Sequence, residues 1–263
     1  MPILRRLRTR VRKSLPPWVV QAVRLVLWRR VVRLAGITNW AVAYGPFAGM
    51  KYASDTLLPS SGGGLQKLLG AYEIQCAQFV TMAIATGYSQ VINIGAAEGY
   101  YAVGFALKLP GAEIVAFEAD HQNRCLLEKQ ARLNGVRVQV EGLCTPGTLS
   151  ERLKPAALLV VDCEGAELQL LDPAKVPELR SADILVEFHD YLNPELSGTI
   201  LRRFEQTHRH EIVPQERPSA ALYPLLSPLS PEDQACFLNE PRLPGMTWGF
   251  LRSNQARAEA LHG

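Results

Sequence analysis

The stretch VINIGAAEGYYAVGFA, Val91 to Ala106, places two closely spaced glycines between an apolar segment and an apolar helical pattern. Val91–Gly95 is short and rich in β-branched residues, which predicts a buried strand. The residues from Gly99 to Leu107 predict the helix that follows, and Pro110 and Gly111 end it. A glycine turn between a strand and a helix lets the backbone approach a ligand closely, so this turn is a candidate cofactor site.

Outward from this turn, apolar runs of strand length alternate with helical patterns. This alternation predicts an α/β fold of the Rossmann-like class, with a doubly wound, mostly parallel sheet and helices on both faces. Ligands bind such sheets at the carboxyl ends of the strands, so polar residues there are the candidates for a site. The predicted strands cover residues 91–95, 113–118, 137–142, 157–165, 182–190, 211–215 and 246–253, and residues 214–244 are predicted to form a long ordered loop.

The composition is that of an ordinary globular protein. Hydrophobic residues make up 48% and charged residues 20% of the chain, and no uninterrupted apolar run reaches the roughly 20 residues of a membrane-spanning helix. The five cysteines are widely spaced and include no C-x-x-C pair, which argues against a disulfide framework or a zinc site and favours a reducing, cytoplasmic compartment. We predict one domain over residues 45–263, preceded by a basic helical extension over residues 1–44.

The extension makes the charge distribution asymmetric. Of the 28 Lys and Arg residues, ten lie within residues 1–50, where there is no Asp or Glu, so the remainder carries 18 basic against 25 acidic residues. Residues 1–36 fit three interpretations: peripheral contact with an anionic membrane, organelle targeting, or a helix docked on the body. The helical wheel does not separate its faces cleanly and leaves all three open. No base-reading or base-stacking features accompany the charge, so no nucleic-acid partner is predicted.

The glycine spacing distinguishes between two nucleotide-like cofactors. A dinucleotide site needs G-x-G-x-x-G, whereas this turn reads GAAEG over residues 95–99, and Glu98 at the helix start would repel a pyrophosphate. S-adenosylmethionine has no phosphate, and its positive charges suit a nearby carboxylate. Glu118 lies 23 residues after Gly95, at the end of the next strand, where an acid accepts ribose hydroxyls. We therefore predict S-adenosylmethionine as the cofactor. The predicted cofactor-binding residues are Asn93, Gly95, Ala96, Glu98, Gly99, Glu118 and Asp162.

Several segments together resemble the FkbM-type family of S-adenosylmethionine-dependent methyltransferases. GPFAGMKY (residues 45–52) and LLGAYE (68–73) resemble the lead-in of that family, VINIGAAEG its first cofactor motif, and VAFEAD (115–120) its ribose motif. VVDCEGAELQLL (160–171) resembles its D-x-E-G-x-E segment, and ILVEFHD (184–190) resembles its fifth strand with E-x-H. The resemblance covers residues 45–190 in the same order. The combination is specific, although each segment alone is not.

This resemblance implies a class I methyltransferase fold and transfer of a methyl group, often to a hydroxyl of a sugar, a lipid-linked glycan or a polyketide. The expected partner is therefore a small-molecule or glycan acceptor. Two positions depart from the first motif of the family, because Asn93 stands where Asp is common and Ala97 where Asn is frequent. Asn93 keeps a hydrogen-bonding side chain but supplies no charge to the ammonium or sulfonium of the cofactor.

Polar residues at the ends of two predicted strands are the candidates for the chemistry. His189 is the natural general base for an alcohol oxygen, because the unperturbed pKa of histidine is about 6.5. The alternative is a histidine that only makes structural hydrogen bonds. Glu187 precedes it by two residues on the same strand face and would orient the imidazole or the acceptor. Asp162 is the third catalytic candidate.

Tyr72, Glu164 and Glu167 are predicted to bind the acceptor. The two acids could instead join Asp162 and Glu187 in holding Mg²⁺, or cap the next helix. Since no histidine or asparagine stands within this acidic cluster in the sequence, we predict no metal. One further alternative is an NAD-dependent oxidoreductase, which the glycine spacing disfavours. Another is a degenerate methyltransferase fold kept as a membrane-associated scaffold. Asn93 and the basic extension motivate this second alternative, and the intact strand-end acids and His189 argue against it.

Overall fold

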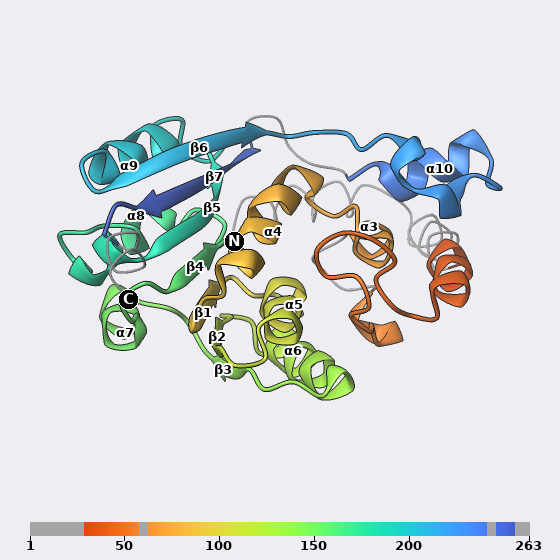
Figure 1. Ribbon diagram of the computed structural model, residues 1–263, viewed down its shortest axis with the longest axis horizontal. Helices are drawn as coiled ribbons and strands as arrows, with labels where there is room; N and C mark the ends of the chain where they lie inside the picture. The colour runs from red at the N-terminus through yellow and green to blue at the C-terminus, as the bar shows by residue number, and fades with distance from the viewer. Residues whose placement is uncertain (1–28, 58–62, 241–245, 256–263) are drawn as a thin grey trace, which may run out of the picture.

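A central seven-stranded sheet organises the chain in the computed structural model, which describes residues 29–57, 63–240 and 246–255 (Figure 1). The strand order is β3-β2-β1-β4-β5-β7-β6. The first five strands of this order run parallel, and β7 is antiparallel to both of its neighbours. The strands are β1 (Gln90–Ile94), β2 (Glu113–Phe117), β3 (Gln139–Glu141), β4 (Leu158–Val161), β5 (Asp183–His189), β6 (His208–Pro214) and β7 (Met246–Ser253).

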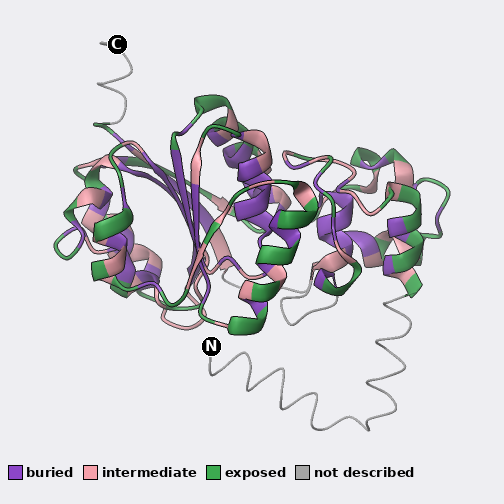
Figure 2. Cartoon of the chain, turned by 90° about the horizontal axis from the view of Figure 1, so that it is seen from below, coloured by how far each residue is buried: buried purple, intermediate pink, exposed green. Residues whose placement is uncertain are grey.

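Helices cover both faces of this sheet, which Figure 2 shows nearly edge-on. One hydrophobic cluster joins one face of the sheet to α4, α5 and α6, and a second joins the other face to α7, α8 and α9. β1 and β4 are buried throughout, as expected for central parallel strands with helices on both sides. The helices are α3 (Gly64–Leu69), α4 (Ala77–Thr86), α5 (Tyr100–Lys108), α6 (His121–Asn134), α7 (Pro146–Arg152), α8 (Glu167–Leu170), α9 (Leu196–Phe204) and α10 (Pro231–Leu238).

The predicted doubly wound architecture is confirmed, and each predicted strand is present within a few residues of its expected bounds. The strand order reverses between β1 and β4, since β2 follows on one side of β1 and β4 lies on the other. The carboxyl ends of these two strands therefore open at a topological switch point, which is where such sheets bind ligands. The glycine turn after β1 lies at this point.

The Pro-rich segment after β6 is ordered, as predicted, but it is more than a loop. It contains the helix α10, which the sequence analysis missed. Ser230 caps this helix by accepting the backbone N–H of Asp233, and Pro231 occupies its first turn, where a missing N–H costs nothing. The S-P-E-D sequence was therefore a helix-start signal within a stretch whose prolines suggested a loop.

The end of the basic extension belongs to the folded body. Residues 29–38 are helical, and Val31 and Leu34 lie in the same hydrophobic cluster as α4 and α5. Arg30 pairs with Asp233 of α10 at 3.0 Å, and α10 also packs on α3 (Figure 1). The structure thus draws no boundary at residue 44. The predicted helix that follows Pro16 and Pro17 lies outside the described residues, apart from this last part.

One segment, Gly64–Thr86, is long and apolar enough by composition to cross a membrane. In the structure it forms α3 and α4, which are separated by a turn at Gly70 where φ is +82°. More than half of its most apolar window, 56%, is buried inside the protein. Its apolar character is therefore that of core helices.

Replacing Leu34 by alanine tests whether the helix at residues 29–38 is part of the fold. Leu34 is 0% exposed, so Leu34→Ala should lower the free energy of unfolding by about 2–5 kcal/mol. Val32 lies on the same helix but is 42% exposed, so Val32→Ala should change the free energy of unfolding by no more than about 0.5 kcal/mol. Urea denaturation of the full chain measures both. Equal stability of the two variants would contradict the docking of this helix.

Candidate functional site

The turn after β1 depends on glycine for a steric reason. Gly95 has φ of +80°, and a Cβ placed there would lie 1.7 Å from the backbone oxygen of Asp162. Gly99 has φ of +99°, and its Cβ would meet the side chain of Leu127 at 2.9 Å. The first glycine thus lets the turn after β1 touch the end of β4, and the second lets α5 begin close against α6.

Glu118, directly after β2, holds this turn in place by accepting hydrogen bonds. Its Oε2 accepts the backbone N–H of Ala97 at 2.8 Å, and its Oε1 accepts that of Asp120 at 2.8 Å. Ala97 has φ of +47°, an uncommon conformation for a residue with a side chain, and this hydrogen bond helps to hold it. A carboxylate has about four lone-pair directions, so two remain for a ligand hydroxyl. Glu118 is thus placed for the predicted ribose contact and also shapes the turn.

The backbone N–H groups of the turn are already engaged within the protein. Those of Gly95 and Ala96 both donate to the carbonyl of Phe117, at 2.9 and 3.1 Å. Together with Ala97, three consecutive N–H groups therefore point at β2 and its end. A pyrophosphate would need such donors free, so the turn is poorly suited to a dinucleotide.

Glu98 does not serve the role that the sequence suggested. Its side chain is buried and forms an ion pair with Lys67 of α3, whose Nζ lies 4.5 Å from the ring centroid of Tyr72. The negative charge of Glu98 is thus offset by Lys67, and we correct its predicted role as a partner for the charges of the cofactor. Tyr72 contributes its ring to this buried cation, and its role as an acceptor contact stays a prediction.

Asn93 lies within β1 and is almost fully buried. Its Nδ2 donates to the carbonyl of Val160 at 3.4 Å, while its Oδ1 has no hydrogen-bond partner. An unpaired buried acceptor is costly, so it calls for a donor that the protein does not supply. The predicted contact between Asn93 and a cofactor fits this orphaned oxygen.

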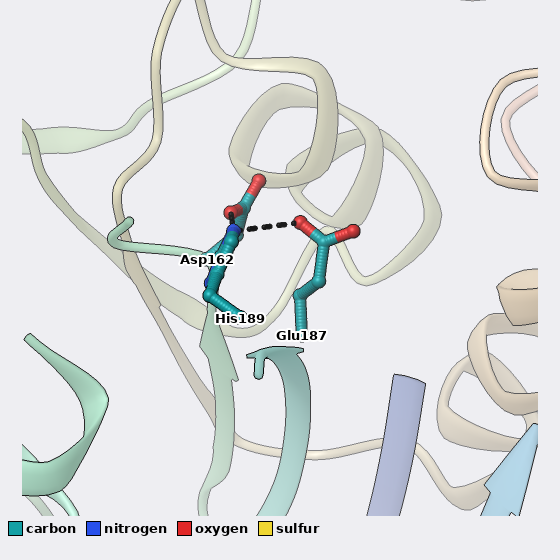
Figure 3. A group of neighbouring side chains, drawn as sticks. All are labelled: Asp162, Glu187 and His189. Carbon is teal, nitrogen blue, oxygen red and sulfur yellow. Dashed lines mark ion pairs between the residues drawn. The ribbon is translucent and has the colours of Figure 1, made fainter. Parts of the chain in front are cut away.

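The carboxyl ends of β4 and β5 and the start of α8 bring together four residues, which we call the acid–histidine cluster: Asp162, Glu167, Glu187 and His189. Figure 3 shows three of them, Asp162, Glu187 and His189. His189 is at its centre and is 0% exposed. Its Nδ1 lies 2.8 Å from Glu167 Oε1, and its Nε2 lies 3.3 Å from Glu187 Oε2 and 3.5 Å from Asp162 Oδ1. Three carboxylates thus surround one imidazole.

These surroundings contradict the prediction that His189 is a general base. Burial by itself would lower the pKa of His189, yet the carboxylates of Glu167, Glu187 and Asp162 raise that pKa to about 11. At neutral pH the imidazole therefore holds both protons and has no site to accept another. This environment could not be predicted from the sequence, because His189 and Glu167 are 22 residues apart.

Glu167 is likewise misassigned by the sequence. Its side chain has no exposed surface, and its Oε1 accepts from the backbone N–H of Cys163 and contacts His189. It orients the imidazole and cannot reach an acceptor. Glu164 is exposed and accepts a hydrogen bond from the Tyr191 hydroxyl at 3.3 Å, so its predicted contact with the acceptor stays open.

Asp162 is the member of the cluster that reaches the surface, with 24% of its side chain exposed. Burial and the neighbouring charge of Glu187 raise the pKa of Asp162 well above its usual range. Glu73 also contributes to this rise, so it lies near the cluster. Glu73 is buried and accepts from the Tyr101 hydroxyl. Glu73 ends the segment LLGAYE, and the sequence analysis missed it as a candidate site residue.

A small pocket adjoins these residues on the side of α4 and α5. Glu73, Tyr72, Tyr100 and Tyr101 line it, together with Phe47. The pocket is therefore largely aromatic with one buried carboxylate.

The structure thus brings most of the predicted residues to one edge of the sheet. Asn93, Gly95, Ala96, Gly99 and Glu118 surround the turn, and Asp162 joins this turn to the acid–histidine cluster through the contact with Gly95. We predicted no metal because the acidic cluster contains no histidine in the sequence. This reason does not hold in the folded protein, where His189 lies among the carboxylates.

Comparison with solved structures finds similarity to several methyltransferases. A Klebsiella pneumoniae protein assigned as an O-methyltransferase is 16% identical, with 76% of this chain and 93% of that one covered at a TM-score of 0.46. The precorrin-6y C5,15-methyltransferase of Geobacter metallireducens is 10% identical (67% and 89% covered, TM-score 0.45), and an rRNA methylase of Streptococcus thermophilus is 12% identical (66% and 95% covered, TM-score 0.44). No protein-family model and no curated protein sequence matches the chain.

At these identities and TM-scores the likenesses say nothing of what this chain acts on, and the assignment of the fold rests on its own sheet. Five parallel strands in the order 3-2-1-4-5, followed by an antiparallel β7 between β5 and β6, define the class I S-adenosylmethionine-dependent methyltransferase fold. The predicted fold class is confirmed.

Replacing Glu118 by alanine tests its role at the turn. The variant leaves the N–H of Ala97 without its acceptor and removes the expected partner of the ribose, so the affinity for S-adenosylhomocysteine should fall by about 1–3 kcal/mol. Glu118→Gln keeps one acceptor oxygen and should lose less. Isothermal titration calorimetry measures both. Unchanged affinity in Glu118→Ala would place the cofactor elsewhere.

Proposed function

We propose that this protein is an S-adenosylmethionine-dependent methyltransferase that acts on a hydroxyl oxygen. The observation that carries the proposal is Glu118, which holds the GAAEG turn in place through two backbone N–H groups and has acceptor capacity left for a ligand hydroxyl. The orphaned Oδ1 of Asn93 in the neighbouring strand adds an unpaired acceptor. The resemblance of residues 45–190 to the FkbM-type family supports the same assignment and the choice of a hydroxyl acceptor.

The chain would position the reactants and screen them from water. S-adenosylmethionine would supply a methyl group on a positively charged sulfur. Asp162 lies beside Gly95 and is partly exposed, so we place the acceptor hydroxyl at its carboxylate, between the turn and the acid–histidine cluster. In-line transfer forms the oxygen–carbon bond as the carbon–sulfur bond breaks, with the electron pair passing to sulfur and the hydroxyl proton to a carboxylate or water. Alignment of this kind lowers a barrier by up to about 7–11 kcal/mol.

Ligand titration tests the cofactor. S-adenosylmethionine and S-adenosylhomocysteine should both bind the full chain, whereas NAD should not, because the N–H groups a pyrophosphate needs are donated to Phe117 and Glu118. Calorimetry with the three compounds in parallel measures this. Micromolar binding of NAD, with no binding of S-adenosylmethionine, would overturn the proposed function.

A matched pair of glycine variants locates the binding. Gly95→Ala places a Cβ against the backbone of Asp162 and should weaken the binding of S-adenosylhomocysteine at least about tenfold. The Cβ of Gly111→Ala would lie in open space, so this variant should bind S-adenosylhomocysteine with unchanged affinity. Circular dichroism shows whether the first variant folds. A folded Gly95→Ala protein that binds normally would remove the turn from the site.

We also propose, independently, that residues 1–28 contact an anionic membrane surface from the cytoplasmic side. Residues 1–28 carry seven Lys or Arg residues and no Asp or Glu, which suits attraction to such a surface. Full-length protein should float with anionic vesicles and protein lacking residues 1–28 should not, since each basic residue contributes up to about 1 kcal/mol. Equal recovery of both would exclude this attachment.

A further inference from the structure

We propose that Asp162, Glu187 and His189 hold a divalent metal cation at the carboxyl ends of β4 and β5 (Figure 3). The site itself is argued from the geometry of these three side chains. Only the role of the cation, which is to bind the acceptor oxygen, rests on the proposed function.

The spacing of the ligand atoms fits one cation. Nε2 of His189 lies 3.3 Å from Glu187 Oε2 and 3.5 Å from Asp162 Oδ1, and the three groups offer ligand atoms within 4.8 Å of one another. Two ligand atoms that are each about 2.1 Å from a metal and about 90–110° apart lie about 3.0–3.4 Å from each other. The spacing of 3.3 Å lies in this range and that of 3.5 Å lies just above it, so small side-chain movements would bring the three groups to one cation.

The Nε2 atom of His189 is a second, independent sign. It is fully buried and has no hydrogen-bond partner, although it points between two carboxylates (Figure 3). Buried polar atoms without partners are rare, and each requires an explanation such as a missing ion. A cation between Nε2, Glu187 and Asp162 would satisfy this nitrogen and both carboxylates at once.

Glu167 holds the His189 ring from the side opposite to the proposed cation. It contacts Nδ1 of His189 at 2.8 Å, on the side of the ring opposite to Nε2. Histidines that bind metals nearly always donate the other ring N–H to a carboxylate or carbonyl, which fixes the tautomer and the ring orientation. A cation bound there would displace the proton of Nε2, and Glu167 then acts as a positioning residue that directs the Nε2 lone pair at the proposed cation.

The charges of the acid–histidine cluster also favour a bound cation. Three carboxylates share this small volume with one imidazole, and Glu73 lies near Asp162 as well. Buried charges are costly unless they are paired or coordinate a metal. A divalent cation would offset the excess negative charge, and the partial exposure of Asp162 gives it a route of entry.

The ligand set indicates which cation. One imidazole nitrogen with two carboxylates suits Mn²⁺, Fe²⁺, Co²⁺ or Zn²⁺ better than Ca²⁺, which takes six to eight oxygens. Three protein ligands leave positions open on the metal. An acceptor with two adjacent oxygens, such as a vicinal diol of a sugar, would chelate there, and coordination would lower the pKa of the hydroxyl to be methylated. This chemistry supplies the activation that His189 cannot.

Calorimetry with Mn²⁺ and, separately, Zn²⁺ tests the site in the full chain after treatment with a chelator. Wild-type protein should bind one equivalent, and Asp162→Asn and Glu187→Gln should each weaken binding at least about tenfold. Glu167→Gln should weaken it about 10–100-fold through the orientation of His189. Glu195→Gln is the matched control, because this exposed acid stands at the start of α9 outside the cluster, and the affinity of this variant should stay within about twofold of wild type.

Pulsed electron paramagnetic resonance of the Mn²⁺ complex gives a readout that folding defects do not mimic. Nitrogen modulation from a directly bound imidazole should be present in wild type and weakened in Glu167→Gln. Absence of bound Mn²⁺ and Zn²⁺ at millimolar concentration, absence of nitrogen modulation, or equal affinity in wild type, Asp162→Asn and Glu187→Gln would each overturn the metal site.

Titration of S-adenosylhomocysteine into the same samples separates this proposal from the proposed function. Binding of the cofactor product without binding of a metal would remove the cation and leave the methyltransferase. Binding of the metal without the cofactor product would leave the cation site and remove the methyltransferase.

Discussion

The contact between Gly95 and the backbone of Asp162 is the constraint on which the site depends. The turn after β1 and the end of β4 meet with no room for a side chain, because a Cβ on Gly95 would lie 1.7 Å from the carbonyl oxygen of Asp162. β1 and β4 are neighbouring strands at the point where the strand order reverses. The contact therefore joins the turn that Glu118 holds to the acid–histidine cluster.

The acid–histidine cluster shows how one imidazole organises several acids. Glu167 holds one nitrogen of His189, and the other nitrogen is directed between Glu187 and Asp162. The helix dipole gives little help here, since α8 is only one turn long. An arrangement with three carboxylates around a fully buried ring is unfavourable unless positive charge is close, and this requirement connects the burial of His189 to the chemistry proposed for it.

A smaller group of helices stands beside the sheet and closes one side of the site. The helix at residues 29–38, α3 and α10 pack together through the Arg30–Asp233 pair and the contacts of Gln66 with α10 (Figure 1). From this group, Lys67 reaches the start of α5 and pairs with Glu98. The basic extension thus belongs to the same group of helices as Lys67, although it is distant from the motif in sequence.

The sequence by itself determined the elements and their order, for a local reason. The apolar runs of β1, β4 and β5, the glycines at 95 and 99 and the acid at 118 lie in short segments whose period and turn chemistry can be read directly. The sequence also located Asn93 within a strand, and Glu118 and Asp162 at the ends of strands. It missed α10, because prolines that suggest a loop also occupy the first turn of a helix.

Only the tertiary structure decided what the charged residues do. Glu98 has its partner 31 residues away in Lys67, and His189 has its partner 22 residues away in Glu167. Neither pairing leaves a local pattern, and both reverse the role that the residue type suggested. The physical reason is that the protonation and availability of a buried group depend on the charges packed around it, and those neighbours are set by the folding of the sheet and its helices.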